Sequence, residues 1–521
     1  MAHWLDNAIF YEIYPQSFKD SNADGIGDFP GIVSRLDYIQ SLGCNAIWMN
    51  PCFESPFNDA GYDVSNYFRA APRYGTNEDL RVLFRAVHER GMRLLLDLVP
   101  GHTSIAHPWF QASMSPEPNP FSDRYIWTND AFDGMTAVSD AQLCGWLRGI
   151  SDRSGAAAVN FFSSQPALNY GYANPQAPWQ QAVDAPGPRG TIEAMKDVMR
   201  FWLDLGCDGF RVDMALSLVK GDPDRTATIQ LWREFRAMLD AEYPDAVMVS
   251  EWGNPAESLK GGFHMDFLLH FGESHYTDLF RAENPWFRED GKGTIRPFVE
   301  TYRRYDEEAS REALICIPSG NHDMTRIAYH LNEAERKVAF AFLLAMPGAP
   351  FIYYGDEIGM RYLPGLRSVE GGYKRTGSRS PMQWDKSVNA GFSSAPKEDL
   401  YIQIDPDPDR PTVADQERNP DSFLNYVKKL IQVRQANEPL RTHGAVEFIL
   451  PESGEYPLGL LRTGEAGSIL VALNPVGESR TLASPRPLGE TIFSVGDVRV
   501  VGANRIELGG TSAAYVRVHS G

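Results

Sequence analysis

The sequence has few cysteines and no long hydrophobic run. Its five cysteines are odd in number and scattered, without a CxxC pair or another metal-binding spacing. This usage is typical of free thiols in a reducing compartment, so we expect a cytoplasmic protein. No apolar stretch approaches the ~20 residues of a membrane helix, and the first residues do not resemble a signal peptide, although one already removed would leave the same start. We expect no association with membranes.

Positive charge is also scarce relative to negative charge. Lysine and arginine number 49 against 68 aspartates and glutamates, which gives a formal charge of −19. Such a surface repels nucleic acids and anionic membranes, which disfavours both as partners. It favours neutral or cationic ligands but identifies none, and nothing in the sequence indicates an oligomeric state. The length of 521 residues suits a large barrel with insertions plus a small domain.

A helix, a glycine and a buried strand repeat along the first half of the chain. Thr76 begins one such unit, apolar residues recur at helical spacing from Leu80 to Val87, and Gly91 ends the helix before the apolar run 93–99. The same order recurs up to the run 209–212. This alternation is typical of parallel βα units. Runs that fit the strands of an eight-stranded barrel are 9–13, 46–49, 93–99, 209–212, 247–250, 265–268, 314–317 and 351–354.

Two segments depart from this rhythm. Residues 103–172 are rich in Pro, Ser, Asn and Trp, and after residue 440 short apolar runs alternate with turn residues. We therefore predict an α/β protein, a (β/α)8 TIM barrel formed by 1–102 and 173–440. A subdomain, 103–172, is inserted after the third strand, and 441–521 form a C-terminal antiparallel β-sandwich domain. The Gly/Pro/Asp-rich stretch 361–421 is too long for a plain connection, which is typical of functional or mobile loops.

Four polar segments follow predicted strands and would meet at one rim of the barrel. They are Asp97–His102, Gly209–Asp213, Ser250–Trp252 and Ser319–Asp323. Glycoside hydrolysis uses two carboxyl groups that flank the scissile bond. Arg211 lies two residues before Asp213, on the same face of its strand, and would keep that aspartate ionised. One strand-end acid alone is more often a cap or a solvated residue, but four in order make coincidence improbable.

These four segments resemble the conserved regions of the α-amylase family, glycoside hydrolase family 13. The segments 11–18, 61–63 and 379–385 are similar to its oligo-1,6-glucosidase and α-glucosidase branch. The resemblance implies that Asp213 is the nucleophile, Glu251 the general acid/base, and Asp323 the acid that stabilises the transition state. It places a second set around the same sugar: His102, Arg211 and His322. It implies a retaining mechanism without an organic cofactor.

The resemblance also implies a substrate and a pocket. Asp59 and Tyr62 match residues that hold and stack on a terminal glucose, and Arg379 matches an arginine that pairs with that aspartate. The implied substrates are disaccharides and short oligosaccharides. A transglycosylase or sugar isomerase with the same site is an open alternative, and a non-catalytic barrel is disfavoured because the catalytic acids are present. Met214, after the nucleophile, is neither the Val nor the Thr usual there, so linkage preference stays open.

A loop near the start of the chain carries oxygen side chains at alternate positions. A structural Ca²⁺ or Mg²⁺ would be held by Asp20, Asn22, Asp24, the Ile26 carbonyl and Asp28. The alternative is a loop bonded to its own backbone through Asx turns. The calcium site of α-amylases is not expected here, because Gly101, Ala167 and Ser217 stand where the family has ligands.

Overall fold

An eight-stranded parallel barrel forms the centre of the molecule in the computed structural model, which describes residues 3–132, 144–309 and 314–519. Its strands are β1 Phe10–Ile13, β2 Ala46–Met49, β5 Arg93–Leu98, β8 Gly209–Val212, β9 Val247–Ser250, β10 Met265–Phe267, β11 Leu314–Cys316 and β12 Phe351–Tyr353. The strands pair in chain order, β12 pairs with β1, and a bridge between Pro318 and Phe351 closes the ring. The predicted barrel is confirmed, including its sixth strand.

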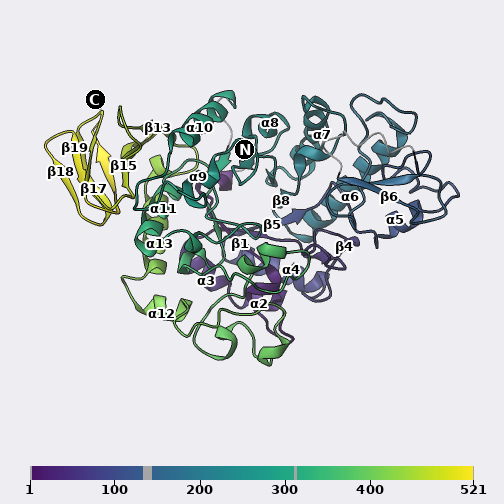
Figure 1. The fold of residues 1–521 in the computed structure, drawn as a ribbon, viewed down its shortest axis with the longest axis horizontal. Helices are drawn as coiled ribbons and strands as arrows, with labels where there is room; N and C mark the ends of the chain where they lie inside the picture. The colour runs from purple at the N-terminus through teal and green to yellow at the C-terminus, as the bar shows by residue number, and fades with distance from the viewer. Residues whose placement is uncertain (1–2, 133–143, 310–313, 520–521) are drawn as a thin grey trace.

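Helices surround the barrel (Figure 1). The longer ones are α4 Asn77–Glu89, α6 Pro186–Leu205, α7 Thr226–Glu242, α10 Arg296–Glu308, α11 Glu333–Leu343 and α13 Phe423–Ala436. The shorter ones are α1 Pro15–Phe18, α2 Phe29–Val33, α3 Leu36–Leu42, α8 Pro255–Lys260, α9 Tyr276–Phe280 and α12 Val413–Arg418. Thr76 and Asp79 form a capping box at α4, as its sequence suggests. Among the described residues no helix is long and apolar enough to cross a membrane.

The segment between β5 and α6 projects from one side of the barrel, away from the C-terminal domain (Figure 1). It contains α5 Pro108–Ser113 and an antiparallel pair, β6 Gly145–Arg148 with β7 Ala156–Val159. A smaller pair, β3 Phe53–Glu54 with β4 Asn66–Ala70, follows β2. A bridge between His102 and Ala167 ties the insertion to the end of β5. The insertion therefore reaches the rim on which the polar segments lie.

The C-terminal domain consists of two antiparallel sheets. One contains β13 Ala445–Ile449, β14 Leu458–Gly464, β15 Gly467–Asn474, β17 Leu488–Val495 and β20 Ser512–Val518, and the other β16 Arg480–Ala483, β18 Val498–Val501 and β19 Arg505–Leu508. Side chains of both sheets, such as Leu470 and Ile506, pack in one buried cluster. This arrangement is the predicted antiparallel β domain.

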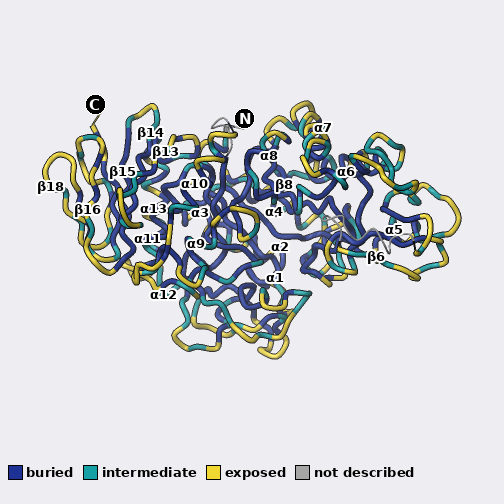
Figure 2. Tube along the Cα trace, turned by 45° about the horizontal axis from the view of Figure 1, so that its top comes forward, coloured by how far each residue is buried: buried dark blue, intermediate teal, exposed yellow. Residues whose placement is uncertain are grey.

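A buried arginine of the C-terminal domain reaches the barrel, at a point where a buried arginine of the barrel itself binds neighbouring carbonyls. Arg434 of α13 donates to the carbonyls of Leu344, Met346 and Gly348, just after α11. Arg462 of β14 donates to the carbonyl of Ala345. These carbonyls follow the end of α11 at Leu343, and the two arginines supply them with buried donors. Figure 2 shows that buried chain runs continuously from the barrel toward the strands of the C-terminal domain.

Candidate active site

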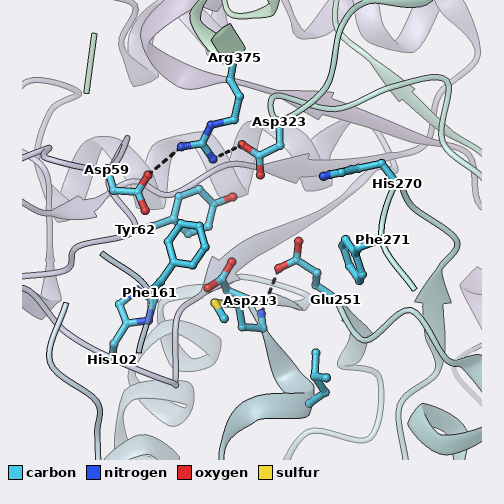
Figure 3. A pocket seen from close by; sticks show the side chains of 12 residues that line it. Asp59, Tyr62, His102, Phe161, Asp213, Glu251, His270, Phe271, Asp323 and Arg375 are labelled. Carbon is cyan, nitrogen blue, oxygen red and sulfur yellow. Dashed lines mark hydrogen bonds and ion pairs between the residues drawn. The ribbon is translucent and has the colours of Figure 1, made fainter. Parts of the chain in front are cut away.

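A cavity of about 300 Å³ opens at the carboxyl ends of the barrel strands. Its walls come from several βα loops and from the insertion, as expected for the functional face of such a barrel. Figure 3 shows the carboxyl groups of Asp59, Asp213, Glu251 and Asp323 gathered around it. The full lining is Asp59, Tyr62, His102, Phe161, Asp213, Met214, Leu216, Glu251, His270, Phe271, Asp323 and Arg375.

Arg211 connects three carboxyl groups at the bottom of the cavity. Its Nη1 lies 3.0 Å from Asp97 and 2.9 Å from Asp213, and its Nη2 lies 3.0 Å from Glu251. Burial raises the pKa of Asp213, the Glu251 carboxyl raises it further, and Arg211 opposes both effects. One guanidinium therefore holds the two proposed reacting carboxyl groups side by side, an arrangement that suits a retaining glycosidase.

The backbone after β8 and β9 fixes this pair. Met214 adopts a left-handed conformation with φ of 42°, and its N–H donates to Glu251 Oε2 at 3.1 Å. Such strain in a residue with a side chain is characteristic of functional sites. On the other side, Asp266 of β10 accepts from the Ser250 hydroxyl at 2.8 Å and from the Trp252 N–H at 3.1 Å. Burial raises the pKa of Asp266 to about 7.

Asp323 lies across the cavity from this pair. It contacts Arg379 at 2.8 Å, Arg375 at 2.9 Å and His322 at 3.4 Å. Burial would raise the pKa of Asp323, but the charges of Arg379 and Arg375 oppose it, and the pKa lies well below the usual value. Asp323 is therefore ionised and can stabilise positive charge that develops on a bound sugar.

The expected pair between Asp59 and Arg379 is wrong. Asp59 pairs instead with Arg375 at 3.4 Å, and Arg375 also holds Asp323 (Figure 3). Arg379 is buried and donates to the His322 carbonyl at 2.9 Å. The 3₁₀ turn Tyr373–Ser378 directs the earlier arginine into the cavity and the later one behind it. Arg375 lies four residues before Arg379, and no motif in the sequence distinguishes the two arginines.

The aromatic and imidazole side chains differ in their access to the cavity. Tyr62 lines it and stacks on His322, with ring centroids 5.5 Å apart and 14° between planes. His322 is fully buried and does not line it. His102 lines it, and its Nδ1 lies 3.0 Å from the Asn160 amide nitrogen. The buried Nε2 of His102 has no hydrogen-bond partner within the described part of the chain.

Part of the cavity wall is formed by residues that were not predicted from the sequence. Phe161, Leu216, His270 and Phe271 join Met214 on the cavity surface. Aromatic and apolar surfaces of this kind pack against the carbon faces of sugars. No periodicity or motif in the sequence distinguishes these residues from ordinary packing residues, so they could be found only from the structure.

A buried lysine lies beside the position where α-amylases bind calcium. Lys220 donates to Asn160 Oδ1 at 3.2 Å and to the Ser217 carbonyl. A side chain added at Gly101 would approach the Asn160 amide to 2.9 Å. The ammonium group of Lys220 thus supplies positive charge at this point of the fold.

The loop from Asp20 to Asp28 is closed by its own hydrogen bonds. Asp20 accepts from the backbone N–H groups of Asn22, Ala23 and Gly25, and Asp28 accepts from that of Ser21. Over the described ranges no group of three or more His, Cys, Asp or Glu side chains is arranged to hold a metal ion. The contacts fit the Asx-turn alternative, and the predicted cation stays a prediction.

The barrel places paired carboxyl groups around a buried arginine at its functional rim. This arrangement is typical of enzymes that act on glycosidic bonds. The comparison with known families gives the same class, because the alpha-amylase catalytic-domain model matches residues 12–443. The chain belongs to the α-amylase family, glycoside hydrolase family 13, and is a glycoside hydrolase or a closely related transglycosylase.

Relatives within this family carry several activities in their names. The chain is 31% identical to the trehalose synthase/amylase TreS of Mycolicibacterium smegmatis, over 84% of this chain and 77% of that protein. It is 30% identical to a glucan 1,6-alpha-glucosidase of Streptococcus pneumoniae, over 92% of each. It is 29% identical to a probable alpha-glucosidase of Rhizobium meliloti, over 99% and 97%. Hydrolases and synthases are thus both similar to this chain.

Solved structures include close matches to the whole chain. The trehalulose synthase MutB from Pseudomonas mesoacidophila MX-45 has a TM-score of 0.82 at 26% identity, with both chains fully covered. A MutB mutant in complex with the substrate sucrose has a TM-score of 0.84 at 27% identity, again over both whole chains. These likenesses support the fold.

Proposed function

We propose that this protein is a retaining α-glucosidase-type enzyme that takes one glucosyl unit at a time from the non-reducing end of short α-glucosides. The observation that carries the proposal is a cavity with paired charged groups at both ends. Arg211 holds Asp213 beside Glu251 at one end. At the other end Arg375 spans the gap between Asp59 and Asp323.

The proposed reaction has two displacements. Asp213 attacks the anomeric carbon while Glu251 protonates the departing glycosidic oxygen, which leaves a covalent glucosyl–aspartate. Glu251, now a carboxylate, removes a proton from water or from an acceptor hydroxyl. That oxygen attacks the anomeric carbon and releases Asp213. Two inversions retain the configuration, and ionised Asp323 stabilises the positive charge in both transition states.

The far end of the cavity argues for a terminal glucose. Asp59 is 4% exposed, so its carboxyl group loses water when a sugar enters. A desolvated charged group needs hydrogen-bond partners, and the hydroxyls of a terminal glucose supply them. We expect the Arg375 bridge to exclude a second sugar beyond the first. Binding thus selects a chain end over an internal unit.

Transfer to a sugar acceptor is the second candidate. Phe161, Met214, Leu216 and Phe271 give the cavity an apolar wall against which an acceptor sugar can pack. The trehalose and trehalulose synthases among the similar proteins are named for products in which a glucosyl unit joins another sugar. Excluding water from the glucosyl–enzyme would favour the same outcome here.

The deciding experiment is product analysis with maltose, isomaltose, sucrose, trehalose and longer maltodextrins. We expect glucose or single-glucosyl transfer products, with NMR of the first product showing retained configuration. Asp213→Ala and Glu251→Gln are expected to remove turnover and to leave the melting temperature close to that of the wild type. Inverted product, or more than a few per cent of activity in either variant, would contradict the mechanism.

We also propose that the Asp20–Asp28 loop takes up a structural cation. Its support is the oxygen side chains at alternate positions and the exposed Asp24 and Asn22. The test is metal analysis followed by melting curves in excess EDTA and in excess Ca²⁺, with Asp24→Ala as the matched variant. No bound metal and identical curves would reject the cation and favour the Asx-turn loop.

A further inference from the structure

Glu12 is a buried carboxyl group beneath the cavity that the proposed reaction does not use. It lies on β1 and is fully buried. Its Oε1 is 3.0 Å from His322 Nδ1 and 3.2 Å from the Asn50 amide nitrogen. Its Oε2 has no hydrogen-bond partner in the ranges that the structure describes. Among the described residues, the side-chain hydrogen bonds of Glu12 are therefore to His322 and Asn50.

The direction of hydrogen bonding fixes the form of His322. The Tyr62 hydroxyl donates its one hydrogen to Asp97 at 3.1 Å. At 2.7 Å from His322 Nε2, the same oxygen must then accept, so Nε2 carries a hydrogen. Burial lowers the pKa of His322 to about 3, and the ring is neutral. A neutral ring with hydrogen on Nε2 has a bare Nδ1 that can only accept.

Because Nδ1 carries no hydrogen, its contact with Glu12 indicates whether Glu12 is protonated. Asn50 donates to Nδ1 at 3.0 Å. If Glu12 were a carboxylate, its Oε1 would present a lone pair to the Nδ1 lone pair at 3.0 Å, which is repulsive. If Glu12 keeps its proton, the same contact is a hydrogen bond. The geometry favours the carboxylic acid.

The charges around the cavity also favour the protonated form of Glu12. Each of five other carboxyl groups contacts an arginine, namely Asp59, Asp97, Asp213, Glu251 and Asp323. Glu12 has no arginine contact of this kind within the described residues. Burial raises its pKa, Asn50 and Arg211 oppose the shift, and Asp97 and Asp323 add to it. Tyr276 and Tyr353 are further titratable groups that interact electrostatically with Glu12.

We propose that Glu12 is a positioning residue that stays protonated and donates to His322 Nδ1. It thereby fixes the Nε2–H of His322 on the Tyr62 hydroxyl and toward Asp323. The consequence rests on the proposed function: Tyr62 and Asp323 keep one orientation against the sugar. A neutral Glu12 also adds no negative charge behind the Asp323 carboxylate.

The test compares Glu12→Gln with Glu12→Ala in the full chain, with the surface substitution Glu78→Gln as the matched control. The glutamine amide is neutral and can donate to Nδ1. We expect kcat/KM within about threefold of wild type and unchanged limbs of its pH profile. Glu12→Ala leaves Nδ1 without this donor, so we expect a fall of about 10- to 100-fold, mainly in kcat. The contrary result is a shift of the acid limb of the kcat/KM pH profile to lower pH by about half a unit or more in Glu12→Gln. That result would mean that Glu12 is ionised in the wild type, and the proposal would be wrong.

A second measurement is independent of any substrate. Nitrogen NMR of ¹⁵N-histidine-labelled protein, assigned with a His322→Gln variant, distinguishes protonated from bare ring nitrogens. We expect His322 to show a bare Nδ1 and a protonated Nε2 from about pH 5.5 to 8, in wild type and in Glu12→Gln alike. A protonated Nδ1 would overturn the proposal even if Glu12→Ala failed to fold. If no α-glucoside were turned over, the proposed function would fail while this result still decided the state of Glu12.

Discussion

Truncating Asp59 to alanine removes one end of the wall that closes the cavity. The carboxyl group accepts from Gln165 at 2.8 Å and pairs with Arg375 at 3.4 Å. Burial raises its pKa to about 6, and Gln165 and Arg375 limit the rise. In Asp59→Ala the amide of Gln165 loses this acceptor, and Arg375 is left with Asp323 and the carbonyl of Gly371.

The size of the effect follows from the lost hydrogen bonds. A hydrogen bond to a charged group contributes about 1.5–3 kcal/mol. At about 1.4 kcal/mol per tenfold change, the loss of one such bond to a terminal glucose lowers kcat/KM for maltose by about 10- to 150-fold. A long maltodextrin is expected to lose less, because its chain can extend past the missing wall. In Asp59→Ala, the fall in kcat/KM should therefore be larger for maltose than for a long maltodextrin.

The assay measures kcat/KM for maltose and for maltoheptaose in wild type, Asp59→Ala and Asp59→Asn. Asparagine fills the same volume and keeps an acceptor for Gln165 but carries no charge. We expect it to slow both substrates to a similar degree, because the wall remains in place. Asp59→Ala within about threefold of wild type on maltose would refute the pocket. Early mixed-length products from maltodextrin with the wild type would refute it as well.

Three further predictions concern stability. The folded pKa of Asp266, about 7, lies above its unfolded value, so its contribution is present at low pH and is lost as pH rises through 7. Asp266→Asn should flatten the dependence of the melting temperature between about pH 4 and 8, and an unchanged slope would contradict this. Lys220→Met leaves the Ser217 carbonyl without its donor and should cost about 2–5 kcal/mol in urea unfolding, whereas a cost under about 1 kcal/mol would reject the role of the ammonium. Gly209→Ala puts a carbon 2.0 Å from the Val247 carbonyl oxygen and should cost about 3 kcal/mol or more, so near-wild-type melting would show that the strands can separate there.

The barrel was predictable because local signals and burial agree. The apolar run 93–99 is β5, and the run 265–268, short and weakly marked, is β10 because its neighbours on both sides complete its pairing. The acids after the strands follow from the same logic, since parallel strands bring their carboxyl ends together. A repeated motif thus locates the catalytic rim without knowledge of any contact.

The path of the loop 361–421 was not predictable from the sequence. For that reason the predicted pair between Asp59 and Arg379 was wrong. The loop is held by Glu370, which accepts from Arg73 at 2.5 Å and from Gln16 at 3.1 Å. These partners lie 297 and 354 positions away in the chain. No local pattern encodes such contacts, so nothing in the sequence decides which of the two arginines faces the cavity.

The arginine junction between the two domains has a consequence for the order in which the chain folds during synthesis. The carbonyl of Ala345 lies 117 positions before Arg462, its donor. Because a nascent chain emerges from its N-terminus onward, the Ala345 carbonyl leaves the ribosome before Arg462 can bind it. This contact is expected to form only when the C-terminal sheet arrives. The C-terminal sheet therefore supplies a contact that the barrel lacks until this sheet has been made.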